Sequence, residues 1–169
     1  SALTLLAART IARLSACANG WKSRSALLDK LTTGGFNRRF QPVKTGCEWI
    51  TSDEEIAASY GRDPLRCFRF TVNAYDNMFV SIGEAQSARR MKGIPKSLPL
   101  LLISGECDPV GGFGKGVRAA YARYRAAGLQ QVRCLLYPGC RHELLNEVNR
   151  ESVYADLLDW MNAHMAAGQ

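Results

Sequence analysis

The sequence has 169 residues, of which 47% are hydrophobic and 22% are charged, and 22 Lys or Arg against 15 Asp or Glu give a net charge of +7. This composition is typical of a globular chain, and every apolar run is shorter than the roughly 18 residues that a membrane-spanning helix needs. Arg9 and Arg13 interrupt the first apolar stretch, and no small-residue cleavage site follows it. We therefore expect no transmembrane segment and no secretory signal.

Residues 1–19 have the pattern of an amphipathic helix. Its apolar stripe is formed by Leu3, Leu6, Ala7, Ile11 and Leu14. We expect this stripe to pack on an N-terminal half of the protein that the 169 residues do not include.

The positive charge is concentrated in the first third of the chain. Residues 1–50 contain eight Lys or Arg and two acids. Such a patch could attract an anionic lipid surface, an acidic substrate or nucleic acid. We favour a solvated face or an acidic neighbouring half, and no recognition helix or aromatic platform indicates nucleic acid.

The segment from 20 to 91 is predicted to be irregular and helical. Short helices are expected at 23–31 and 53–60, the second with Asp53 at its start and acidic residues in its first turn. Helix breakers separate the helices, at Gly34-Gly35, Pro42 and Asp63-Pro64.

The segment from 92 to 169 has the pattern of an α/β fold. Residues 98–104 and 132–137 are short apolar runs that indicate buried strands. Between them, residues 113–127 have helical spacing and end at Gly128, which is typical of a helix C-terminus. A strand, helix, strand unit of this kind makes the two strands parallel neighbours with a right-handed crossover.

A last helix is expected from Arg150 to about 166. Before it, Asn146, Glu147 and Asn149 are expected to cap its start and to have no role in chemistry. His164 is expected to be exposed on this helix.

Two polar residues follow the two predicted strands. Asp108 lies in SGECDP, and His142 lies in YPGCRHE. Because the carboxyl ends of parallel strands meet at one edge of a sheet, we expect these side chains to lie close together. Each is an ordinary turn residue when taken alone. Together they indicate an acid and base pair, in which the carboxylate fixes the imidazole tautomer and the imidazole accepts a proton near neutral pH.

These motifs resemble a known family. GECDPVG and YPGCRHE are similar to the C-terminal half of the α/β-hydrolase superfamily, in its branch of monoacylglycerol lipases, lysophospholipases and serine aminopeptidases. The resemblance implies that Asp108 and His142 are the acid and base of a Ser-His-Asp triad that needs no cofactor. It also implies that 20–91 is a helical cap, or lid, and that 92–169 is the C-terminal segment of the core.

The cap's aromatic residues could line an acyl pocket, although aromatic residues at such positions mostly hold short helices together. They are Phe36, Phe40, Trp49, Phe68, Phe70 and Phe79.

The family's nucleophile has no counterpart in these residues. The family places its serine in G-x-S-x-G between a strand and a helix, and this motif does not occur here. Ser104 lies on the strand before the acid. A two-stranded sheet is also marginal in water. We therefore expect the serine and the other strands on an N-terminal half, which was lost by proteolysis, was never part of this piece, or resides on another polypeptide.

Cysteine spacing does not indicate a metal site. The six cysteines, at positions 17, 47, 67, 107, 134 and 140, form no C-x-x-C pair, and only two histidines are present. Their scatter is typical of reduced thiols, so we expect a cytoplasmic protein. Cys107 and Cys140 are near the candidate pair, and we expect them to be bystanders because a reactive thiol needs an activating environment.

Two functions follow from these observations. The first is hydrolysis of carboxylic esters, such as lysophospholipids or monoacylglycerols, with the acid and base on this chain and the serine elsewhere. The second is an inactive binding or assembly piece that associates through its sheet edge and its N-terminal helix. The chain alone is expected to be inactive.

Overall fold

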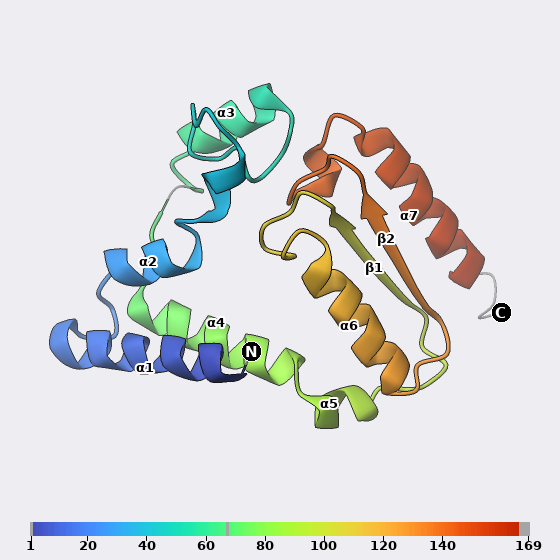
Figure 1. Cartoon of the computed structure of the whole chain (residues 1–169), viewed down its shortest axis with the longest axis horizontal. Coiled ribbons are helices and arrows are strands. Elements are labelled where there is room, and N and C mark those ends of the chain that lie inside the picture. Colours follow the sequence, from blue (N-terminus) through green and yellow to red (C-terminus); the bar gives the residue numbers. More distant parts are fainter. Residues whose placement is uncertain (1, 67, 166–169) are drawn as a thin grey trace.

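The computed structural model describes residues 2–66 and 68–165. In chain order the elements are α1 (Ala2–Asn19), α2 (Ala26–Thr32), the 3-10 helix η1 (Phe36–Arg39), α3 (Glu54–Arg62), α4 (Val72–Ala85), α5 (Ala88–Lys92), β1 (Leu100–Gly105), α6 (Lys115–Ala126), β2 (Val132–Tyr137), the 3-10 helix η2 (Leu144–Asn146) and α7 (Arg150–Met165). Figure 1 shows α1, α2 and α4 grouped on one side and the small sheet with α6 and α7 on the other. No helix in the described part of the chain is both long and apolar enough to cross a membrane.

The sheet consists of β1 and β2, which pair in parallel from Leu100 opposite Val132 to Gly105 opposite Tyr137. Helix α6 makes the crossover between them (Figure 1). The predicted strand, helix, strand unit is therefore confirmed, with every boundary within two residues. The parallel pair with its crossover helix agrees with the predicted α/β fold class.

The two faces of the sheet are covered by different helices. On one face, Ile103 and Leu135 pack with Val153 and Leu157 of α7. Successive side chains of a strand point to opposite faces. The next residue, Leu136, accordingly approaches the start of α6 at Gly114. The last helix therefore contributes to the core of the sheet and supports the loop that carries His142.

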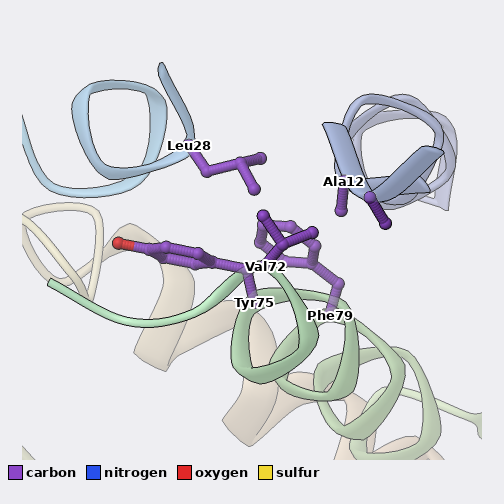
Figure 2. Close-up of a cluster of buried hydrophobic side chains, with 6 residues drawn as sticks. Ala12, Leu28, Val72, Tyr75 and Phe79 are labelled. Carbon is purple, nitrogen blue, oxygen red and sulfur yellow. The ribbon is translucent and has the colours of Figure 1, made fainter. Parts of the chain in front are cut away.

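The helical group has its own core, which Figure 2 shows. Val72, Tyr75 and Phe79 of α4 are buried against Ala12 of α1 and Leu28 of α2. Burying each large side chain contributes roughly 1.5–3 kcal/mol. Alanine in α1 allows the two long helices to approach closely, and an ion pair of 3.0 Å between Arg9 and Asp76 also joins them.

The buried face of α1 differs from the predicted stripe. Within this chain, α1 packs on α4 through Leu5, Ala8, Ile11, Ala12 and Ala16. Ile11 belongs to both faces, whereas the three leucines of the predicted stripe, Leu3, Leu6 and Leu14, are exposed. The predicted boundary at residue 19, between the first helix and the cap segment, therefore separates α1 from α4, although these two helices share a core. Packing of the exposed stripe on another part of the protein stays a prediction.

The short helices in the segment from 20 to 91 were predicted only in part. Helix α2 begins after Ser25, whose side chain accepts a hydrogen bond from the Leu28 amide. Helix α3 begins after Asp53, whose carboxylate accepts from the amides of Glu55 and Ile56. Both agree with the predicted helices within three residues. The sequence did not predict α4 and α5.

Candidate active site

The ends of β1 and β2 bring the two candidate residues together. Asp108 comes three residues after β1, and His142 comes five residues after β2. Backbone hydrogen bonds continue the pairing past the strands, from the Glu106 amide to the Tyr137 carbonyl and from the Cys107 amide to the Cys140 carbonyl, both 2.9 Å. The two loops therefore leave the sheet side by side.

Gly105 allows this close approach. A Cβ at this position would lie 2.1 Å from the carbonyl oxygen of Cys140 and 2.2 Å from that of Arg141. Both distances are far below contact distance, and both atoms belong to the backbone. Only glycine lets the loop with His142 pass this close to the end of β1.

The loop after β1 fixes the carboxylate of Asp108. One oxygen, Oδ1, accepts a hydrogen bond of 2.8 Å from the Val110 amide, and the Asp108 carbonyl accepts one of 2.8 Å from Phe113. Gly111 is close to the other oxygen, since a Cβ there would lie 3.3 Å from Oδ2. Phe113 has a φ of 56°, which is uncommon for a residue with a side chain. The hydrogen bonds of the turn therefore orient the Asp108 carboxylate, in addition to its side-chain rotamer.

Asp108 and His142 form a close pair. His142 Nδ1 lies 3.2 Å from Asp108 Oδ2, and the exposed fractions of the side chains are 37% for the imidazole and 9% for the carboxylate. Burial acts to raise the pKa of Asp108, but the hydrogen bonds from His142 and from the Val110 amide outweigh it and lower that pKa below its ordinary value. The hydrogen bond to Asp108 raises the pKa of His142, against the lowering effect of burial.

The ionised state of Asp108 determines which nitrogen of the His142 imidazole is free to accept a proton. An ionised carboxylate can only accept hydrogen bonds. Nδ1 of His142 therefore donates to Asp108, and Nε2 is left with its lone pair. Within residues 2–66 and 68–165, Nε2 has no hydrogen-bond partner. The pair is arranged as a base whose tautomer is fixed by an acid.

The segment before α3 contacts the imidazole. The ring centroids of Trp49 and His142 are 5.1 Å apart, and those of Phe36 and Trp49 are 5.0 Å apart. The guanidinium carbon of Arg141 lies over the ring of Phe40, 4.3 Å from the ring centroid. The other aromatic residues singled out in the sequence pack elsewhere: Phe68 and Phe70 near Tyr75, and Phe79 in the core of α4.

A pocket of about 460 Å³ lies next to the loop of His142, but neither Asp108 nor His142 is among its lining residues. Its lining includes Phe40, Lys44, Ala57 and Ala58 from the 20–91 segment and Arg141 from the loop of His142. The lining combines apolar carbon with charged groups of both signs, since Glu48 and Glu54 also contribute to it.

Two further residues hold the loop of His142, and neither role was predicted from the sequence. The guanidinium of Arg141 donates to the carbonyls of Glu48 and Thr51, the latter at 3.0 Å. The carboxylate of Glu147, which is fully buried, accepts from the amides of Ser52 and Arg141. The prediction that Glu147 caps a helix is wrong. No local pattern could have revealed its role, because Ser52 lies 95 residues away along the chain.

Ser104 is held on the acid side of the pair. Its hydroxyl is buried, 3.3 Å from the Gly105 carbonyl and 3.5 Å from Asp108 Oδ2. A nucleophile must instead face the free Nε2 of His142. The arrangement can therefore accept and return a proton, and Ser104 does not lie where the attacking hydroxyl is needed.

The nearby thiol of Cys140 is not activated. Burial raises the pKa of Cys140, and the charge of Glu147 raises it further, although its hydrogen bond to Asn149 acts in the opposite direction. A nucleophilic thiol needs a lowered pKa. Five cysteines, all except Cys67, which lies outside the described residues, are free thiols. In the described part of the chain, no three or more His, Cys, Asp or Glu side chains are grouped to hold a metal ion.

The chain is similar to several known hydrolases. The chain is 25% identical over 119 residues to a monoacylglycerol lipase of Mycolicibacterium smegmatis, covering 69% of this chain and 39% of the lipase. Among solved structures, a thermostable carboxyl esterase of Bacillus coagulans in complex with glycerol has 26% identity and a TM-score of 0.81, covering 94% of this chain and 52% of the esterase. A lipase in its open form has 26% identity and a TM-score of 0.76, covering 96% of this chain and 51% of the lipase.

A monoglyceride lipase of Saccharomyces cerevisiae, with 18% identity and a TM-score of 0.58, covers 92% of this chain and 46% of that structure and shares the fold. The chain spans about 40 to 50% of the length of these relatives. The family described as serine aminopeptidase, S33, matches residues 6–149. Since that match covers most of the sequence, the chain belongs to the serine aminopeptidase S33 family of α/β-hydrolases.

Proposed function

We propose that this chain supplies the acid and the base of a serine hydrolase that cleaves carboxylic esters of the monoacylglycerol or lysophospholipid type. The observation that carries the proposal is the pair of Asp108 and His142, with 3.2 Å between Oδ2 and Nδ1 and a free Nε2. The named relatives, a monoacylglycerol lipase and a carboxyl esterase, support an ester or lipid substrate. The nucleophilic serine is supplied from outside residues 1–169, on an N-terminal half that carries G-x-S-x-G.

The proposed reaction is acyl transfer to water. His142 Nε2 takes the proton of the serine hydroxyl as its oxygen attacks the ester carbonyl, and returns that proton to the departing alcohol. Water then attacks the acyl-enzyme with the same base, and the carboxylic acid leaves. Asp108 remains ionised throughout, holds Nδ1–H and stabilises the imidazolium. The lowered pKa of Asp108 supports this role.

The segment from 20 to 91 acts in this proposal as the cap over the site, and the segment from 92 to 169 as the C-terminal part of the core. The contacts of Trp49 with His142 and of Arg39 with the ring of Phe113, the latter at 3.8 Å, support a cap that closes on both catalytic loops. The pocket beside Arg141, with apolar carbon and charged groups of both signs in its lining, supports binding of a substrate with apolar and polar parts.

The test is an esterase assay on the protein together with the half that carries the serine. p-Nitrophenyl butyrate, a monoacylglycerol and a lysophosphatidylcholine serve as substrates. His142→Ala is expected to lower kcat by about 10⁴-fold or more, since a triad acts as a unit. His164→Ala is the control, because His164 lies on α7 and its Nδ1 contacts the Trp160 carbonyl at 2.7 Å. Full activity in His142→Ala rules out the assignment.

A second candidate function is a binding or assembly piece without catalysis. The exposed apolar residues of α1, Leu3, Leu6 and Leu14, favour it. It requires a stable complex, so light scattering that finds only a monomer of 18.6 kDa in the presence of a candidate partner counts against it.

We also propose a reducing, cytoplasmic location. The five free cysteines support it. Full alkylation of these thiols in freshly lysed cells, without added reductant, is the expected result, and blocked thiols would contradict it.

A further inference from the structure

Glu147 is a buried carboxylate that the proposed reaction does not use. Its exposed fraction is 0%, and it follows the short 3-10 helix η2 after His142. One oxygen accepts a hydrogen bond of 2.6 Å from the Arg141 amide, directly before His142. The other accepts from the amide and the hydroxyl of Ser52, the amide at 3.1 Å. Burying a charge is costly unless it is fully hydrogen-bonded.

The donors to Glu147 come from two parts of the chain that are far apart in sequence. Ser52 precedes α3 in the cap segment, whereas Arg141 belongs to the loop of His142. Figure 1 shows the segment before α3 close to the ends of β1 and β2. The carboxylate therefore joins these two segments through a single buried group.

Neighbouring contacts strengthen the same junction. The Glu143 amide donates to the Ile50 carbonyl at 2.7 Å, and the Thr51 hydroxyl donates to the Asn146 carbonyl at 2.7 Å. The cationic side chains near Glu147 bind other groups and not its carboxylate. The guanidinium of Arg141 binds cap carbonyls, and that of Arg150 contacts the Glu147 carbonyl at 3.3 Å and Asp53 at 3.7 Å. In the described residues, no cation pairs with the Glu147 carboxylate, so hydrogen bonds from neutral groups hold it.

We propose that Glu147 is a positioning residue for His142, a latch between the cap segment and the loop of the base. The latch fixes the backbone at Arg141 relative to Ser52, and Trp49 of the same cap segment contacts the imidazole. The position of the cap segment and the position of the His142 imidazole are therefore coupled. The inference rests on the proposed function for its kinetic consequence, and on geometry alone for its effect on His142.

The variants separate the hydrogen bonds from the charge. Glu147→Leu keeps much of the volume and removes both acceptors. Glu147→Gln keeps Oε1 as the acceptor for the Arg141 amide and for the Ser52 amide, which lies 3.2 Å from that oxygen. The new amide group can donate to the Ser52 hydroxyl, so this variant should restore most of what leucine loses. Asp159→Leu is the matched control, because Asp159 is an exposed carboxylate within α7, away from the loop of His142.

The first readout is the pKa of His142 from NMR titration of the imidazole Cε1–H signals. The chain contains only two histidines, so His164 serves as the internal reference. In Glu147→Leu, the pKa of His142 is expected to fall toward its ordinary value as the bond to Asp108 loosens, while Glu147→Gln and Asp159→Leu keep it raised. An unchanged pKa of His142 in folded Glu147→Leu overturns the proposal.

The second readout is kinetic. Glu147→Leu is expected to lower kcat about 10- to 100-fold at nearly constant KM, as displacement of a catalytic group by about 1 Å does, and Glu147→Gln to recover most of that loss. A lower Tm with kcat and the pKa of His142 unchanged would mean a purely structural role and would overturn the proposal.

If Glu147→Leu does not fold, the Ser52→Ala variant tests the proposal instead. It removes one hydroxyl donor and keeps the amide, and a smaller fall in the pKa of His142 is expected, whereas no change overturns the latch. Absence of esterase activity in the wild-type chain combined with the half that carries the serine would refute the proposed function, while the NMR titration of His142 would still test the latch.

Discussion

Replacing Gly105 with alanine tests how tightly the two loops of the site must pass each other. The added Cβ would lie 2.1 Å from the Cys140 carbonyl oxygen, whereas ordinary contact begins at 3.4 Å, so the backbone must move back by about 1.3 Å. Neither neighbour is a flexible side chain. Overpacking of this kind costs about 3 kcal/mol, the upper end of the usual range. For a chain of this size, that corresponds to a fall in Tm of about 6–12 °C.

The same displacement should impair the pair of Asp108 and His142. A shift of about 1 Å in a catalytic group can lower kcat about 100-fold. Thermal unfolding by circular dichroism and esterase kinetics measure the two effects. Gly35→Ala is the control, since its Cβ would have no neighbour nearer than 3.8 Å and its φ is −100°. A Gly105→Ala protein with wild-type Tm and kcat would refute the close approach.

Two further predictions concern ionisation and burial. Asp108 has a lowered folded pKa, so its contribution to stability is present above its ordinary value of 3.8 and is lost as the pH falls through the folded pKa. His142 has a raised folded pKa, so its contribution is full below 6.5 and is lost as the pH rises through the folded pKa. The difference in Tm between wild type and Asp108→Asn should therefore be largest between about pH 4 and 6.5, and a difference independent of pH would contradict the pairing. Burial, together with the hydrogen bond of 2.9 Å to Asp156, raises the pKa of Tyr137 to about 12. Tyr137→Phe should cost about 1–2 kcal/mol, or about 2–8 °C in Tm, and an unchanged Tm would mean that this bond contributes nothing.

The sheet and the candidate pair could be predicted because their signals are local. Apolar runs of strand length, a helix ending at Gly128 and turn residues after each strand are enough to place Asp108 and His142 at one sheet edge. The structure brings Nδ1 and Oδ2 within 3.2 Å.

Helix α4 could not be predicted in the same way. Val72, Tyr75 and Phe79 are β-branched or aromatic and have modest helix propensity. Their helix is stabilised by packing on α1 and α2, which only the folded chain reveals. Thr71, whose side chain accepts from the Ala74 amide, is the local signal that could have marked its start.

The face of α1 that packs on α4 was not predicted. The helix buries Ala12 and Ala16 on that face, and these small residues allow α4 to approach closely. The leucines of the predicted stripe are exposed in this chain, and their packing on another part of the protein stays a prediction. Long-range partners were equally hidden, as the hydrogen bonds between Glu147 and Ser52 illustrate.

The most direct test of the central claim is labelling with a fluorophosphonate, which reacts only with activated serines, followed by peptide mass spectrometry of the protein and its His142→Ala variant. The account predicts one labelled serine, in a G-x-S-x-G peptide outside residues 1–169, and loss of that label in His142→Ala. Label on a serine of this chain, such as Ser104, or labelling that does not depend on His142, would contradict it.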